Sequence, residues 1–204
     1  MMKKKTALTS IVIVVILIVS VAIGFIAQML FDAIDRERYP RPETEYVIEG
    51  GKSMTIRQMV EEYTEAYGVP EYLVYAVIRT ESSFDVNAMS RRGAIGLMQM
   101  TSDTFAWMQT KTKESLSDEA IYSPNVNIKY GTYYLSYLYY QFGDWDLVLA
   151  AYNAGPGNVN SWLDDDRYSD GNGHLTNIPF EETRNYVQKV NDAVEVYKRL
   201  YYNN

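Results

Sequence analysis

The stretch VYAVIRTESS, residues 74–83, follows a helical pattern that ends on an acid. Val74, Val77, Ile78 and Glu81 fall at positions i, i+3, i+4 and i+7, which lie on one face of a helix. The first three are apolar, as a buried face requires. Burial disfavours the carboxylate anion, and the negative end of the helix dipole acts in the same direction, so we expect a raised pKa for Glu81. Such an acid suits proton donation to a leaving oxygen, but it can equally be a structural carboxylate satisfied by an arginine or by backbone donors.

Helical spacing of apolar residues continues through most of the chain after residue 52. A stripe that includes Ile56 and Tyr63 starts behind a capping box of Thr55 and Gln58, and Gly68 stops it. The other expected elements are a helix from Pro70 to about Glu81, a loop over 82–100, a short helix capped by Thr101 or Ser102, a long helix through Ile128 and Phe142, a helix over 145–153 with Asp144 as its N-cap, and a final helix through Val187 and Tyr197. No strand of period two and no internal repeat stands out, so the sequence predicts an all-α domain.

The N-terminus contains an uncharged apolar run over residues 11–31, in which only Ser20 and Gln28 are strongly polar. A run of about twenty such residues is long enough to cross a bilayer as a helix. Lysines at positions 3–5 precede the run and acids follow it, and by the positive-inside rule this pattern keeps the short N-terminus in the cytoplasm. We therefore expect a single-pass protein of the cell membrane whose remaining chain is extracytoplasmic.

A cleaved signal peptide is the alternative, with Ala22, Ile23 and Gly24 as a poor cleavage site, and it would give a secreted protein. The apolar run continues past that site, which favours a retained anchor. The charged segment with Pro40 and Pro42 that follows is typical of a tether. The predicted organisation is a cytoplasmic N-terminus at 1–6, a transmembrane anchor at 7–31, an extracytoplasmic linker at 32–52 and a folded domain at 53–204.

The composition excludes several classes of protein. The 204 residues carry a net charge of −7, which argues against nucleic-acid binding, because that function normally needs a basic face. The chain has no cysteine, so neither a disulfide framework nor a thiolate metal site can exist. Its one histidine, His174, lies in a polar loop, where a lone histidine is usually solvated. We expect no metal and no cofactor.

Three motifs at and after Glu81 resemble a known family. They are ESSFDVNAMSRRGAIGLMQM at 81–100, AYNAGPGNV at 151–159 and PFEETRNYVQKV at 179–190. Together they closely resemble the soluble lytic transglycosylase (SLT) domain, a goose-type-lysozyme-like family that cleaves the glycan strands of peptidoglycan. The resemblance extends from about Ile56 to Tyr197, and three motifs in this order are far more specific than any one alone. It implies a lysozyme-like helical domain.

The resemblance also assigns roles to residues. It implies that Glu81 is the single catalytic acid/base. It implies that the substrate-binding residues are Ser90, Gln99, Tyr134, Tyr152, Asn153 and Tyr186. Asp85 matches a position of the loop after the acid that takes no part as a nucleophile. Thr101 departs from the family, which usually has Met there, and the resemblance implies that the residue at this position can pack against a substrate sugar. The threonine puts the subsite preferences in doubt rather than the reaction.

The implied activity is cleavage of the β-1,4 bond between N-acetylmuramic acid and N-acetylglucosamine, with formation of a 1,6-anhydromuramoyl end. The expected partners are peptidoglycan glycan strands and, through the N-terminal helix, the membrane. A hydrolytic muramidase and a non-catalytic wall-binding or scaffolding domain remain as alternatives. The sequence leaves open the choice between exo and endo cleavage, the physiological role, the protein partners and the oligomeric state.

Overall fold

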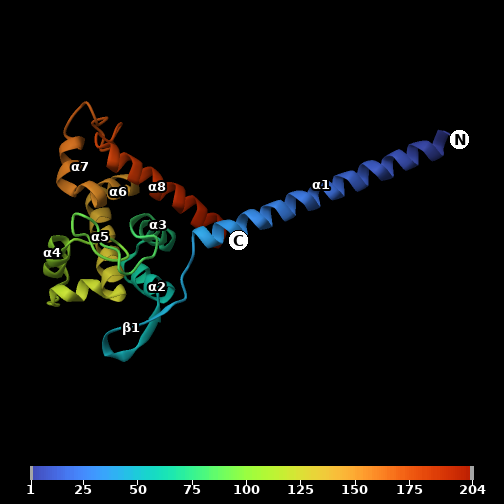
Figure 1. Ribbon diagram of the computed structural model, residues 1–204. Coiled ribbons are helices and arrows are strands. Elements are labelled where there is room, and N and C mark those ends of the chain that lie inside the picture. The colour runs from blue at the N-terminus through green and yellow to red at the C-terminus, as the bar shows by residue number, and fades with distance from the viewer. Residues whose placement is uncertain (1, 203–204) are drawn as a thin grey trace. The chain divides into compact units, whose positions relative to one another are not determined.

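The structure, a computed structural model, describes residues 2–202 of the chain, with side chains from Val15 onward. By its internal contacts the chain divides into two compact units, residues 1–40 and residues 41–204, and each is described by itself. The first unit contains one long helix, α1, over Met2–Arg38 (Figure 1). Within its described side chains, Val15–Arg38 is long and apolar enough to cross a membrane, a test that an N-terminal signal sequence also passes. This helix therefore indicates a membrane anchor or a signal.

The second unit begins with a small hairpin that the sequence did not reveal. Strands β1 (Glu45–Val47) and β2 (Ser53–Thr55) pair antiparallel, with Tyr46 opposite Met54, and a 3₁₀ turn η1 (Glu49–Gly51) joins them. The expectation that the domain has no strand is wrong here, because strands of three residues are too short to show a period of two. The region over 32–52, predicted as an extracytoplasmic linker, contains the end of α1, strand β1 and the turn η1.

The other named elements of the second unit are helical and are joined by loops. They are α2 (Ile56–Tyr67), α3 (Glu71–Glu81), α4 (Ser102–Thr112), the 3₁₀ helix η2 (Asp118–Tyr122), α5 (Pro124–Phe142), α6 (Trp145–Ala154), α7 (Pro156–Leu163), α8 (Glu181–Tyr197) and the π-helical turn η3 (Lys198–Tyr202). The predicted all-α, lysozyme-like class is thus confirmed in its main features, with the hairpin as a minor addition.

The predicted helix ends are confirmed by their capping contacts. Thr55 and Gln58 form the reciprocal capping box of α2, and Gly68 ends that helix in the left-handed conformation at φ +67°. Thr101 caps α4 by accepting a hydrogen bond from the Thr104 backbone. Asp144 caps α6 by accepting hydrogen bonds from the backbone N–H groups of Asp146 and Leu147. Each N-cap accepts hydrogen bonds from backbone N–H groups that have no partner within the first turn of the helix. Because the cap and these N–H groups are close in sequence, the helix starts could be predicted from the sequence.

The core forms where α5 packs against α2 and α6, and where α8 packs against α3 and α6 (Figure 1). The apolar stripe of α3 faces this core, and Val74, Val77 and Ile78 are fully buried. Many tyrosines serve packing: the rings of Tyr75 and Tyr197 stack between α3 and α8 with centroids 5.4 Å apart. Packing of α3 between these elements brings its C-terminal residue, Glu81, to the edge of the core.

Candidate active site

Glu81 is the last residue of α3, and the chain turns sharply after it. Ser83 and Phe84 both have positive φ angles, 54° and 67°, a conformation that costs energy in residues other than glycine. The Ser82 hydroxyl donates a hydrogen bond of 2.8 Å to the carbonyl oxygen of Leu97. This turn holds the end of α3 against the loop over residues 82–101, so that the Glu81 side chain lies at the junction between them.

The environment of Glu81 changes its acidity. Burial of the carboxyl raises the pKa of Glu81 to about 7, and the smaller influence of the Tyr186 hydroxyl acts in the opposite direction. Tyr186 is itself buried, and its hydroxyl has no hydrogen bond of ordinary geometry in the described part of the chain. The raised pKa that the helical stripe predicted is therefore present, and its cause is desolvation rather than a neighbouring carboxylate.

A buried amide fixes the loop that faces Glu81. Asn127 of α5 accepts a hydrogen bond of 2.8 Å from the Met98 backbone N–H and donates to the carbonyl oxygens of Ile95 and Ile121. Gly96 lies directly against this amide: a Cβ at that position would come within 2.7 Å of Asn127 Nδ2. The loop is therefore held in one arrangement, because the Asn127 side chain binds two of its backbone groups and one of η2, and glycine allows the close approach.

Two predicted binding residues lie on this loop. Ser90 Oγ accepts hydrogen bonds from the backbone N–H groups of Arg92 and Ala94, which leaves its own hydrogen available to a ligand. Gln99 has a positive φ of 47°, and its Nε2 donates to the carbonyl oxygen of Gly96 at 2.9 Å. The side-chain carbonyl of Gln99 is left to accept a hydrogen bond from a ligand.

Two more predicted residues come from the end of α6. The Tyr152 hydroxyl donates a hydrogen bond of 2.7 Å to the Met98 carbonyl oxygen, so it joins α6 to the loop. Asn153 Oδ1 accepts from the Thr183 hydroxyl of α8 at 2.8 Å, which fixes the amide and leaves its NH₂ group free to donate. An amide donor in this position suits a carbonyl oxygen such as that of an acetamido group.

The structure brings five of the seven predicted residues into one pocket of about 440 Å³. These five are Glu81, Ser90, Gln99, Tyr152 and Asn153. Tyr186 is buried next to Glu81 and acts on its carboxyl rather than on the pocket surface. Tyr134 is 7% exposed and packs behind Tyr152, with ring centroids 5.4 Å apart. Direct substrate contact by these last two tyrosines stays a prediction.

Several residues of the pocket were not predicted as binding residues. They are Arg91, Arg92, Ala94 and Glu182; Thr101, whose position the resemblance links to a substrate sugar, also lines the pocket. Arg92 and Glu182 form an ion pair of 3.5 Å across the pocket mouth, between the loop and the start of α8. Two adjacent arginines within the first motif of an acidic chain were the available sequence signal. Asp85, by contrast, is exposed and accepts a hydrogen bond from the Asn87 backbone, so it shapes a turn.

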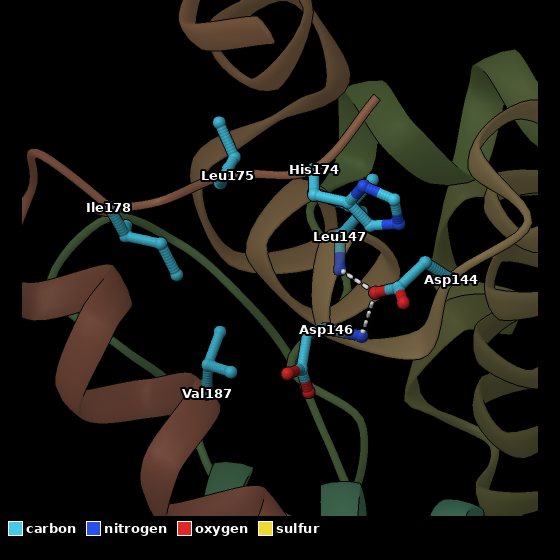
Figure 2. A pocket seen from close by; sticks show the side chains of 7 residues that line it. All are labelled: Asp144, Asp146, Leu147, His174, Leu175, Ile178 and Val187. Atoms are coloured by element: carbon cyan, nitrogen blue, oxygen red, sulfur yellow. Dashed lines mark hydrogen bonds between the residues drawn. The ribbon is translucent and has the colours of Figure 1, made fainter. Parts of the chain in front are cut away.

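Another pocket, of about 180 Å³, lies at the start of α6 and shares no lining residue with the Glu81 pocket (Figure 2). The Asp144 carboxylate points into the backbone N–H groups of Asp146 and Leu147, and aliphatic side chains of Leu175, Ile178 and Val187 line the opposite side (Figure 2). His174 reaches this pocket from the polar loop. Among the described residues, no group of three or more His, Cys, Asp or Glu side chains is arranged to hold a metal ion.

Comparison with known sequences identifies relatives of this chain. The family model described as the transglycosylase SLT domain matches residues 58–174. The chain is 34% identical over 184 residues to the soluble lytic murein transglycosylase of Escherichia coli K12, an alignment that covers 86% of this chain and 26% of that protein. It is 32% identical over 164 residues to the membrane-bound lytic murein transglycosylase C of Pectobacterium atrosepticum, covering 69% of this chain and 46% of the relative.

Solved structures give the same result for the fold. An inactive glutamate-to-glutamine mutant of lytic transglycosylase Slt from Pseudomonas aeruginosa superposes with a TM-score of 0.63 at 37% identity, covering 70% of this chain and 24% of that one. A 70-kDa soluble lytic transglycosylase in complex with bulgecin A superposes with a TM-score of 0.65 at 33% identity, covering 71% and 24%. This chain thus spans about a quarter of the length of these soluble relatives.

Proposed function

Because the chain belongs to the transglycosylase SLT domain family, we propose that it is a peptidoglycan lytic transglycosylase. The reaction is cleavage of the β-1,4 bond between N-acetylmuramic acid and N-acetylglucosamine, and the new muramoyl end closes to a 1,6-anhydro ring. One observation carries the proposal: Glu81 has a buried carboxyl with a pKa of about 7 and opens into a pocket lined by amide and hydroxyl groups. Such a carboxyl is about half protonated at neutral pH and can both give and take a proton.

In the first step Glu81 donates its proton to the glycosidic oxygen, and the bond from this oxygen to C1 of the muramoyl unit breaks. The positive charge that develops at C1 is stabilised by the acetamido group of the same sugar. The free NH₂ group of Asn153 donates to the acetamido carbonyl and orients it, because Thr183 holds the other end of the amide. Departure of the N-acetylglucosamine unit leaves Glu81 as a carboxylate.

In the second step the Glu81 carboxylate removes the proton of the C6 hydroxyl, and the C6 oxygen attacks C1 of the same sugar. The acid is thereby regenerated, and no water is consumed. Attack within one molecule is favoured over attack by water because the hydroxyl is held at a high effective concentration. The same residue therefore acts as acid and then as base.

A single carboxylate is sufficient for this sequence of steps. Most glycosidases use two carboxyl groups. Here Asp85 is engaged in a turn, and Glu182 is exposed and paired with Arg92. Neither residue contributes to the pKa of Glu81, which burial sets. The inactive mutant of the P. aeruginosa relative, which carries one glutamate-to-glutamine replacement, supports the view that one acid is essential in this family.

We further propose that α1 retains the protein in the cell membrane, with residues 1–6 in the cytoplasm and the second unit outside. The lysines at positions 3–5 support this orientation. The membrane-bound relative from P. atrosepticum supports anchoring as a feature compatible with this type of domain. The glycan strands next to the membrane are then the substrate.

Mass spectrometry of the fragments released from purified peptidoglycan tests the reaction. We expect fragments that end in 1,6-anhydromuramic acid, because the sugar's own hydroxyl attacks in place of water. Each such fragment is lighter by the mass of one water than the corresponding hydrolytic fragment. Fragments that lysozyme releases from the same wall serve as the hydrolytic reference. Fragments with reducing ends would show a hydrolytic muramidase instead. Binding to the wall without release of fragments would show a non-catalytic domain.

A further inference from the structure

A third pocket, here called the Tyr72 pocket, lies toward the opposite end of α3 from Glu81 and has no role in the mechanism above. Its volume is about 180 Å³, and its lining comes from the start of α3, the first residue of α6, the C-terminal half of α8 and the start of η3. Tyr72 precedes Glu81 by nine positions on α3, which is about 14 Å along the axis at 1.5 Å per residue. The described lining residues of the Tyr72 pocket and of the Glu81 pocket do not overlap, so the two are separate sites.

Two aromatic side chains from different helices line the Tyr72 pocket. Tyr72 of α3 and Trp145 of α6 are both partly exposed. Tyr139 stacks on Trp145 with ring centroids 4.2 Å apart, which fixes the indole and leaves its other face and its edge to a ligand. Leu73 and Val194 add apolar surface to the lining. Such a lining suits a ligand with an apolar face, because aromatic rings offer a large and rigid contact area.

Three polar side chains of α8 and η3 complete the lining. Asn191 donates a hydrogen bond of 2.7 Å to Asp146 Oδ1, so its own side-chain oxygen can accept from a ligand N–H. Lys198 donates to Glu195 Oε1 at 2.9 Å, and the two side chains are 36% and 73% exposed. An ammonium group has three donors and a carboxylate has two acceptor oxygens, so both side chains can also bind ligand hydroxyl groups.

The charges of the lining favour a neutral ligand. Among the described lining residues of the Tyr72 pocket, Glu195 and Lys198 are the charged ones, and they pair with each other. The pocket at the start of α6 differs, because Asp144 and Asp146 place two carboxylates beside its aliphatic wall (Figure 2). A neutral ring with an apolar face, hydroxyl groups and an amide N–H matches the Tyr72 pocket. N-acetylglucosamine has all three features, and it is one of the two sugars of wall glycan.

We propose that the Tyr72 pocket is a second, non-catalytic binding site for N-acetylglucosamine units of wall glycan, an assignment that takes its ligand from the function proposed above. The sugar ring packs against Tyr72 and Trp145. Its acetamido N–H donates to Asn191, and its hydroxyl groups bind Lys198 and Glu195. The site holds the domain on the wall by glycan that is not in the Glu81 pocket, and it takes no part in the proton transfers.

Nuclear magnetic resonance of the full-length chain in detergent micelles tests sugar binding at this site directly. The chain has three tryptophans, and Trp145→Phe identifies the indole N–H signal of Trp145. The probe is chitobiose, the β-1,4 dimer of N-acetylglucosamine. We expect the Trp145 signal to shift saturably with a dissociation constant of about 1–10 mM. Tyr72→Ala should raise that constant about fivefold, because one of the two packing rings is lost.

The control for the other pocket is Asn153→Ala, which removes an amide from the lining of the Glu81 pocket. The Trp145 titration should be the same in this variant as in wild type. A Trp145 signal that does not move at about 50 mM chitobiose would overturn the proposal. So would a titration that Asn153→Ala weakens as much as Tyr72→Ala does, since the signal would then report on the Glu81 pocket.

Sedimentation with purified, insoluble peptidoglycan tests what the site does for the protein. All chains in this experiment carry Glu81→Gln, so that the wall stays intact. Adding Tyr72→Ala or Trp145→Ala is expected to weaken wall binding about threefold to tenfold. Tyr140→Ala is the matched control, because it removes an aromatic side chain that is 92% exposed and lies outside the Tyr72 pocket, and it should bind like the parent chain.

The proposal fails if both pocket variants bind the wall as tightly as the parent chain. Circular dichroism confirms the fold of each variant, and the use of two variants on different helices keeps the test valid if one of them unfolds. Neither measurement needs turnover. Failure of chitobiose binding at Trp145 therefore leaves the proposed reaction untouched, and absence of anhydro products leaves the binding site standing.

Discussion

At Glu81 the protonation state is set by position in the fold rather than by a partner. The carboxyl ends a buried helix stripe, where loss of hydration disfavours the anion. Among the described residues, the Tyr186 hydroxyl is the one other group that acts on the carboxyl, and it favours the anion. The rate of the reaction should therefore depend on pH through this one residue, in a way that a change at Tyr186 can shift.

We expect kcat/KM for wall cleavage to fall about tenfold per pH unit above pH 7, because the first step needs protonated Glu81. Tyr186→Phe removes the hydroxyl that lowers the pKa of Glu81, so the fall should begin at higher pH. Tyr134→Phe is the control, since its hydroxyl does not act on Glu81. A fall that begins at lower pH in Tyr186→Phe would contradict this description of the site.

The same pKa makes a prediction about stability. Between the unfolded value of 4.5 and the folded value of about 7, the folded protein binds one proton more than the unfolded chain, so the free energy of unfolding decreases as pH rises. Glu81→Gln has no carboxylate to bury. We expect this variant to be more stable than wild type at pH 8, by on the order of 1–3 kcal/mol, and about equal at pH 4.

Urea unfolding at the two pH values provides the measurement. Glu182→Gln serves as the control, because Glu182 is exposed and its replacement should not give the same pH-dependent gain. Equal stability of wild type and Glu81→Gln at pH 8 would show that the Glu81 carboxylate is well solvated, and this would contradict its burial.

The sequence predicted much of the site at this scale, and its misses have a physical cause. Glu81 drew attention as an acid on the apolar face of a helix, which is a local signal, and the resemblance of the surrounding motifs to the SLT domain gave it a predicted role. Arg92 and Glu182 are 90 residues apart and meet only in the folded chain, so no local pattern links them. The packing of Tyr134 against Tyr152 likewise depends on the folded chain and could not be predicted from a local pattern.

At the scale of elements, the loop between α3 and α4 depends on α5. The buried Asn127 side chain forms hydrogen bonds with the backbone of two loop residues, Ile95 and Met98, and a third with Ile121 of η2. The helix caps were predictable because a cap forms between residues that are only two or three positions apart in the sequence. The role of Asn127 was not, since a polar residue on a helix face gives no sign of which distant loop it holds.

Asn127→Ala should lower the free energy of unfolding by about 2–4 kcal/mol, because the buried Met98 N–H and the Ile121 carbonyl lose their Asn127 partner, while the Ile95 carbonyl keeps only its hydrogen bond from the Met100 N–H. Asn125→Ala is the matched control on the same helix: Asn125 accepts one hydrogen bond from the Tyr63 hydroxyl, and its loss should cost about 1 kcal/mol. Urea unfolding measures both. If Asn127→Ala unfolds like Asn125→Ala, the loop does not depend on this amide.

For the whole molecule, the main prediction is that α1 is retained as a membrane anchor and is not cleaved off as a signal peptide. The sequence did not predict the hairpin or the continuation of α1 beyond Phe31 to Arg38. Short charged segments have a similar composition whether they form a linker, a helix end or a strand of three residues. The helix itself was evident from its unbroken apolar run.

We expect the chain to remain in the membrane fraction after alkaline carbonate extraction, at its full mass of 23.5 kDa. A helix of this length and composition inserts stably, since its apolar residues gain from leaving water. Mass spectrometry of the isolated protein checks that residues 1–31 are present. A soluble product that lacks these residues would show a cleaved signal peptide.

The central claim is that Glu81 alone carries the proton transfers. The most direct measurement is the release of fragments from purified peptidoglycan by wild type, Glu81→Gln and Glu182→Gln at equal concentration. We predict that Glu81→Gln releases no fragment above background while its circular dichroism spectrum and wall binding match wild type, and that Glu182→Gln still releases fragments with 1,6-anhydro ends. Fragment release by Glu81→Gln at a rate close to that of wild type would contradict the account.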